Sequence, residues 1–122
     1  MPLTRAQIDQ IYTHILTDIF GMVVGSQLDI ALRQHFLDSP DELRTLADDI
    51  IEDLVYDDNS DAANIRTDIR LMVYHKRTLQ SFTRFLLYRT TTDDGSPESV
   101  DDWLAISNDD FLAYRRSPIG VL

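Results

Sequence analysis

The sequence predicts an all-α protein: a small helical bundle with one long helix (about 62–89) and an extended C-terminal arm. Three observations lead to this prediction. Apolar residues recur at intervals of three and four over much of residues 5–89, capping residues precede these runs, and the TTTDDGSPES stretch that follows is typical of a loop. A chain of 122 residues has the usual length for one hydrophobic core. We therefore expect a helical bundle domain over 1–90, and a loop, short helices and an arm over 91–122.

The first two helices are predicted from their caps and their apolar spacing. Thr4 and Gln7 have the spacing of a capping box, and apolar residues follow at helical intervals as far as Phe20. Gly21 is expected to end this helix, because glycine tolerates positive φ. A shorter helix is expected after Ser26, with its apolar positions at Leu28, Ala31, Leu32 and Phe36.

A third helix is predicted to begin at Ser39-Pro40-Asp41-Glu42, which combines a capping serine, a proline at the first helical position and a glutamate at the third. Apolar residues then form one stripe as far as Val55. We interpret the acids of the opposite side as a solvated face. These acids are Asp48, Asp49, Glu52 and Asp53.

Two functional alternatives for this acidic region remain open. A calcium loop of the EF-hand kind would begin at Asp57, although Ala62 stands where the sharp turn requires glycine. A Mg²⁺ site of an all-α nucleotide hydrolase would need acids that face inward, and the spacing turns them outward.

The long helix is predicted from apolar residues that recur at three- and four-residue steps, which we call the apolar seam. The members of this seam are Ile65, Ile69, Met72, His75, Leu79, Phe82 and Leu86. Such a helix would be roughly 42 Å long, which is more than so small a domain can cover. Near its end the helix is apolar on most sides, so we expect contacts with another subunit there. The apolar interface candidates are Phe82, Phe85, Leu87 and Tyr88.

Charge is unevenly distributed along the chain. The net charge is −10, yet six cations and one acid give residues 62–90 a charge of +5. On one helix, Arg66, Arg70, Arg77 and Arg84 would share a face. This basic strip either pairs with acids of its own chain or meets the acidic side of an identical neighbour, which would produce a head-to-tail ring.

The C-terminal third is predicted to hold two short helices and an arm. Ser99 with Asp102, and Ser107 with Asp110, have the spacing of helix starts. The final residues either form an unstructured tail or dock onto a partner chain. The candidates for a partner-docking arm are Tyr114, Arg115, Arg116, Pro118, Ile119, Val121 and Leu122.

Composition argues against several classes of function. The chain has no cysteine, no bilayer-length apolar run and no signal-peptide order at MPLTRAQIDQ, so we expect an intracellular soluble protein with no membrane partner. The three histidines lie outside metal-ligand or nucleophile spacings, and no phosphate-binding glycine loop occurs. We therefore expect no catalytic residue, no metal and no cofactor, and a protein that is not an enzyme.

The acids and cations are also biased in kind. Aspartate supplies 18 of the 21 acids, and Lys76 is the only lysine among 11 cations. High salt screens self-repulsion, so carboxylates can crowd on such a surface. The composition resembles that of proteins from halophilic archaea and their viruses.

Taken together, the antiparallel helices of residues 4–56, the long helix of 62–89 and the arm of 91–122 resemble the head-tail connector (adaptor) proteins of tailed viruses. The resemblance is architectural and rests on no diagnostic motif. It implies a structural subunit of a homo-oligomeric ring in the virion, with portal and tail proteins as partners and DNA only passing through a channel. The alternatives are an acidic DNA-mimicking inhibitor or small regulatory binding protein in the cytoplasm of a halophilic host, and the Mg²⁺-dependent nucleotide hydrolase.

Overall fold

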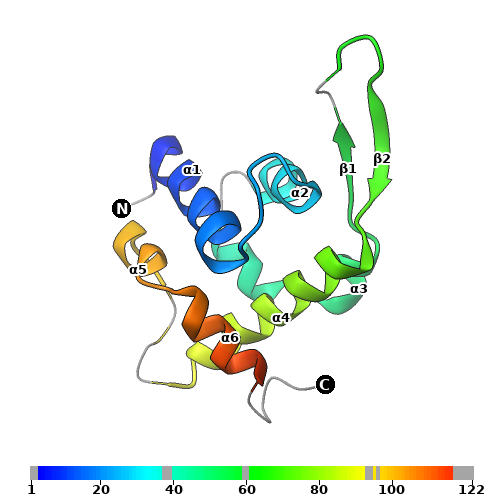
Figure 1. Cartoon of the computed structure of the whole chain (residues 1–122). Coiled ribbons are helices and arrows are strands. Elements are labelled where there is room, and N and C mark those ends of the chain that lie inside the picture. The colour runs from blue at the N-terminus through cyan, green and yellow to red at the C-terminus, as the bar shows by residue number, and fades with distance from the viewer. Residues whose placement is uncertain (1–2, 37–39, 59–60, 93–94, 96, 117–122) are drawn as a thin grey trace.

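The computed structural model describes residues 3–36, 40–58, 61–92, 95 and 97–116. Helix α1 (Arg5–His14) continues as a π-helical segment (Ile15–Ile19) and is followed by α2 (Gln27–Phe36). A 3₁₀ helix (Pro40–Thr45) and α3 (Asp48–Glu52) lead into strands β1 (Val55–Asp58) and β2 (Arg66–Arg70). The chain then forms α4 (Val73–Arg89), α5 (Val100–Leu104) and α6 (Asn108–Arg116). In Figure 1 the two strands project as a hairpin from a body made of helices.

The all-α prediction is wrong. Of the described residues 63% are helical, but β1 and β2 form a two-stranded antiparallel sheet, so the domain is mixed α/β. The predicted helix over 62–89 begins only at Val73, because residues 66–70 are a strand. Asp68 has a φ of 54°, which a right-handed helix does not accommodate. Ile69 pairs with Tyr56 across the sheet, and these β-branched and aromatic side chains favour a strand.

Side chains of α2 cover the outer edge of β1. The Gln34 side-chain amide donates to the Asp57 carbonyl at 2.6 Å and accepts from the Asp57 N–H at 2.9 Å. His35 Nε2 donates to the Val55 carbonyl at 2.5 Å. An unpaired strand edge invites pairing with another chain, so α2 protects this edge.

The predicted third helix is broken into two short pieces. Ala47 lies in an extended conformation (ψ 154°) between the 3₁₀ helix and α3. The buried Thr83 hydroxyl on α4 donates to the Leu43 carbonyl at 2.9 Å, so that carbonyl has a partner outside its own helix. Ser39, the predicted cap, lies outside the described residues.

One hydrophobic core joins the helices and strands that the structure describes. The π-helical segment and its end contribute Ile15, Leu16, Ile19 and Phe20, and α4 contributes Leu79, Phe82, Phe85 and Leu86. α5 lies beside α1, and α6 beside α4 (Figure 1). Side chains from the C-terminal third also enter this core, namely Trp103, Ile106, Phe111 and Tyr114. Residues from both sides of position 90 therefore share one core.

Several local predictions are confirmed. Thr4 and Gln7 form the predicted capping box of α1, and Gly21 follows the π-helical segment with a φ of 69°. Ser99 and Asp102 form a second capping box at α5. At the start of α6, the Ser107 hydroxyl accepts from the Asp110 N–H at 3.1 Å.

Candidate docking surface

Two runs of apolar residues lie on the surface of the folded chain. In the loop between the π-helical segment and α2, Val23 and Val24 are 78% and 57% exposed. At the start of α4, Met72, Val73 and Tyr74 are 63%, 61% and 60% exposed. Three consecutive exposed apolar residues, as at 72–74, are unfavourable in water, so the run at the start of α4 indicates a binding surface.

A hydrogen bond links the second run to the start of α2, the helix that follows the loop of the first run. The Met72 N–H donates to Gln27 Oε1 at 3.1 Å, so the start of α2 contacts the start of α4. Gln27 is three residues from Val24, a length of chain that spans at most about 10 Å. We call the five residues of the two runs the docking surface, which consists of Val23, Val24, Met72, Val73 and Tyr74.

The loop that carries the valines is held in place by a buried carboxylate. Asp29 is only 3% exposed, and its Oδ2 accepts from the Gly25 N–H at 2.7 Å. Arg33 donates to Asp29 at 2.6 Å and also pairs with Asp9 on α1. Burial lowers the pKa of Arg33 while the Asp29 and Asp9 carboxylates raise it, with a net rise. Val23 and Val24 are therefore presented by a fixed loop, which reduces the entropy cost of binding.

The start of α4 is also ordered. Lys76 donates its backbone N–H to the Met72 carbonyl at 3.1 Å, and the Thr78 hydroxyl donates to the Tyr74 carbonyl at 2.9 Å. The ring of His75 lies 5.6 Å from that of Tyr74. Desolvation lowers the pKa of His75 below its usual 6.5, so its imidazole is neutral at pH 7. The apolar run is not interrupted by a positive charge at this position.

Charged side chains of both signs lie near the start of α4. The exposed Arg70 and Arg77 flank residues 72–74 along the chain, and α3 brings Glu52 to Lys76. Glu52 Oε2 lies 3.4 Å from Lys76 Nζ. Lys76 is within one helical turn of Val73, and the exposed Asp53 follows Glu52 in the chain. At the other end of α3, Asp48 pairs with Arg84 at 2.5 Å. All four predicted acids, Asp48, Asp49, Glu52 and Asp53, are exposed.

The apolar interface candidates near the end of α4 divide into two groups. Phe82 is 0% and Phe85 4% exposed, so the chain's own fold buries both. The expectation that a single chain cannot cover these rings is wrong, because α6 packs on this part of α4. Leu87 and Tyr88 are partly exposed, and the Tyr88 ring lies 5.4 Å from that of Tyr114.

The predicted basic strip is not one surface. Arg66 and Arg70 lie on β2, whereas Arg77 and Arg84 lie on α4, so helical spacing does not place them on a common face. Arg66 pairs with Asp58 at 3.3 Å, and Arg84 with Asp48. Pairing within the chain, one of the two alternatives, therefore holds for Arg66 and Arg84.

The predicted arm begins as a helix. Tyr114, Arg115 and Arg116 belong to α6. Tyr114 packs against Phe85 at 5.6 Å, and burial raises the pKa of its hydroxyl. Arg115 lies over the ring of Phe111 at 5.4 Å. The remaining arm candidates, Pro118, Ile119, Val121 and Leu122, lie outside the described residues.

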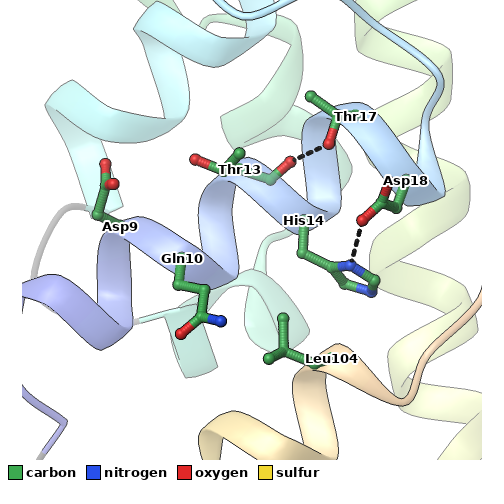
Figure 2. A pocket seen from close by; sticks show the side chains of 7 residues that line it. All are labelled: Asp9, Gln10, Thr13, His14, Thr17, Asp18 and Leu104. Atoms are coloured by element: carbon green, nitrogen blue, oxygen red, sulfur yellow. Dashed lines mark hydrogen bonds and ion pairs between the residues drawn. The ribbon is translucent and has the colours of Figure 1, made fainter.

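A second surface feature is a pocket of about 380 Å³ between α1 and α5. Figure 2 shows its lining residues, with the ring of His14 directed at the Asp18 carboxylate. His14 Nδ1 lies 2.8 Å from Asp18 Oδ2, and His14 Nε2 lies 2.7 Å from the Ile106 carbonyl oxygen. Both ring nitrogens are thus engaged, and neither is free to act as a base or a metal ligand. His14 thus links α1 to the segment between α5 and α6.

The metal-binding alternatives have no support in the geometry. No group of three potential ligands comes together among the residues that the structure describes. The EF-hand alternative needs a helix after its loop, but residues 66–70 are a strand. Asp57 Oδ1 accepts from the Asp68 N–H at 3.0 Å, so this carboxylate supports the hairpin.

No family model matches the chain, and neither a curated protein nor a solved structure shows significant similarity to it. Within the described residues, no helix is long and apolar enough to cross a bilayer. The docking surface was missed from the sequence because the apolar seam assigned Met72 to a buried position. The signal that identifies it is the run of four consecutive apolar residues at 71–74, which helical spacing alone does not explain.

Proposed function

We propose that this chain is a non-enzymatic assembly protein, which forms a homo-oligomer through the docking surface. The observation that supports the proposal most directly is the exposure of two apolar runs, together with the Gln27–Met72 hydrogen bond that links the start of α2 to the second run. The first run lies in a loop that Asp29 anchors at Gly25, and the second lies at the start of α4. Burial against another polypeptide would remove about 25 cal/mol of unfavourable hydration per Å² of apolar area.

The specific role that we propose is a subunit of a head-tail connector ring in the virion of a tailed virus, with portal and tail proteins as further partners. The halophile-like composition and the docking surface support this role. The long helix, which contributed to the resemblance, is shorter than predicted and begins at Val73. The proposal therefore rests more on the surface than on the architecture.

The acidic DNA-mimicking inhibitor is less well supported. Such a protein needs a row of unpaired carboxylates that imitates phosphates. On α3, Asp48 and Glu52 instead pair with Arg84 and Lys76, which neutralises half of the acidic face.

Size-exclusion chromatography with light scattering in about 2 M KCl tests the proposal. We expect the natural chain to give a multiple of the single-chain mass, and Val73→Asp to give the single-chain mass. Ile65→Asp is the matched control, because Ile65 is also aliphatic, is 58% exposed and lies outside the docking surface. A single-chain mass for the natural protein at all concentrations would contradict the proposal, and so would equal dissociation by both substitutions.

A further inference from the structure

The docking surface is flanked by two cations that lack an acidic partner. Arg70 ends β2, and Arg77 follows Tyr74 by three residues on α4. Both arginines are exposed, and neither forms an ion pair with another described residue. Residues three and four apart share a helix face, so Arg77 lies on the same side of α4 as Val73 and Tyr74. The surface therefore combines apolar side chains with positive charge.

Helix α3 carries a surface of the opposite charge. Ile50 is 51% exposed, and two exposed acids, Asp49 and Asp53, stand one residue before it and three residues after it. Within the part of the chain that the structure describes, neither acid takes part in an ion pair. We call Asp49, Ile50 and Asp53 the acidic patch.

The turn of α3 directs this patch away from the molecule's own α4. α3 packs beside α4, and Asp48 and Glu52 supply the ion pairs between them (Figure 1). Ile51 is 0% exposed and enters the core. At about 100° per residue, the members of the acidic patch occupy the remaining side of the helix. Their carboxylates thus face solvent, with no cation of the described chain beside them.

We propose that the acidic patch of a second copy docks on the docking surface. Ile50 of that copy packs against Val73 and Tyr74. Its Asp53 faces Arg77, and its Asp49 lies on the side of Arg70. The inference rests on the proposed function and goes beyond it, because it names the part of the neighbouring chain that covers the surface.

The two surfaces match in spacing as well as in charge. Ile50 and Asp53 are three residues apart on α3, and Tyr74 and Arg77 are three residues apart on α4. Such pairs hold their Cβ atoms about 5–6 Å apart on one helix face. When the two helices lie side by side in the same direction, the apolar residues meet and the opposite charges meet at once. The charges then fix the register, while the apolar contact supplies most of the binding free energy.

An identical copy is the partner that supplies both missing halves. The ion pairs between α3 and α4 of one molecule use Asp48 and Glu52. They leave two acids of α3 and the two cations beside the docking surface unpaired among the described residues. Each copy carries one surface of each kind, so every member of an assembly can use both. A single contact between copies therefore pairs the charges that the fold leaves over.

Charge reversal on each side of the contact tests the inference. Arg77→Asp would bring an acid against the acidic patch, and Asp53→Arg would bring a cation against Arg77. We expect each variant alone to give the single-chain mass by light scattering in about 2 M KCl, because salt screens charges within an interface much less than exposed ones. The double variant Arg77→Asp/Asp53→Arg should regain the natural mass, since the reversed charges again meet their opposites.

Two controls match these variants. Arg5→Asp changes the net charge as Arg77→Asp does, and Arg5 is exposed on α1, outside both surfaces. It should leave the mass unchanged, and dissociation by Arg5→Asp would overturn the inference in favour of an effect of net charge. For the apolar half of the contact, Ile50→Asp should dissociate the assembly, whereas Ile65→Asp, at a residue 58% exposed, should not.

The outcomes separate the inference from the proposed function. If Val73→Asp dissociates the assembly while Ile50→Asp and Asp53→Arg keep the natural mass, the acidic patch is not the occupant and the assembly proposal stands. If the natural chain shows the single-chain mass, the assembly proposal fails and the inference fails with it. Near-ultraviolet circular dichroism of Trp103, which is 2% exposed, reports whether each variant retains its core. A double variant with an intact spectrum that stays at the single-chain mass overturns the pairing of Asp53 with Arg77.

Discussion

Phe82→Ala is the substitution that separates core from interface most clearly. The Phe82 side chain is 0% exposed, and its ring meets those of Phe20 and Phe111 edge-on, with centroids 5.0 and 5.5 Å apart. These two neighbours belong to separate segments, the end of the π-helical segment and α6, so they cannot collapse together into the space that the ring leaves. Loss of a buried phenylalanine lowers the free energy of unfolding by about 3–5 kcal/mol, part of which comes from aromatic pairing.

Urea unfolding in about 2 M KCl measures this loss, with the fluorescence of Trp103, the only tryptophan, as the signal. The free energy of unfolding of a domain of this size is roughly 5–15 kcal/mol, so the expected loss in Phe82→Ala is a large fraction of it. The control is Leu87→Ala on the same helix. Leu87 is 46% exposed, so its truncation should lower the free energy of unfolding by about 1 kcal/mol or less.

One result would refute the burial of Phe82 within its own chain. If Phe82→Ala changes the free energy of unfolding by less than about 1 kcal/mol and instead reduces the mass of the assembly, the ring lies between subunits. The prediction from the sequence that Phe82 is an interface residue would then be right, and the burial of this ring by α6 would be wrong.

Substitutions at three further positions test other parts of the fold. Gln34→Ala removes both hydrogen bonds to the Asp57 backbone and should lower the free energy of unfolding by about 1–3 kcal/mol in urea, whereas Gln34→Glu should disturb mainly the bond to the carbonyl. Because burial lowers the pKa of His75, the unfolded chain binds this proton more readily, so stability should fall as the pH drops below 6.5. His75→Gln should reduce that loss between about pH 7 and 5, measured by thermal unfolding. Hydrogen bonds from the Ser99 and Glu98 backbones lower the pKa of Asp102, so the stability that it contributes should vanish as the pH falls below 3.8. Asp102→Asn should weaken this acid dependence; an unchanged acid transition would contradict the role of the cap.

The elements that could be predicted are those whose signal is local. Thr4 with Gln7 and Ser99 with Asp102 bond within three residues of each other, so their spacing in the sequence contains the whole interaction. The apolar face of α1 was also predictable, since one side of a regular helix enters the core. Neither case depends on where the rest of the chain lies.

Features that depend on distant partners could not be predicted in this way. The break in the third helix is accompanied by a bond from Thr83, forty residues away, to the Leu43 carbonyl. The buried Asp29 carboxylate finds Arg33 one turn later, but its contribution to the loop at Gly25 appears only in the folded chain. Sequence spacing shows which side chains share a face, and not which backbone groups need a partner.

The β-hairpin shows how two periods can coincide in one segment. Ile65, Ile69 and Met72 have helical spacing, yet only Ile69 turns toward the core. Ile65 and Met72 are 58% and 63% exposed. A period of four contains a period of two, so positions 65 and 69 fit a strand as well as a helix. The positive φ of Asp68, at the register shift of the hairpin, interrupts any continuous right-handed helix there.

The error in the long helix and the position of the docking surface have a common origin. A continuous helix would have placed Met72 in the same buried stripe as Leu79 and Phe82. Because the hairpin ends at Arg70 and α4 begins only at Val73, the chain leaves the stripe, and three apolar residues are exposed at the junction. A sequence selected only for this monomer would gain solubility from polar residues at positions 72–74. Their apolar character therefore fits a contact beyond the single chain, and it lies where the local pattern and the fold disagree, as is expected of a functional surface.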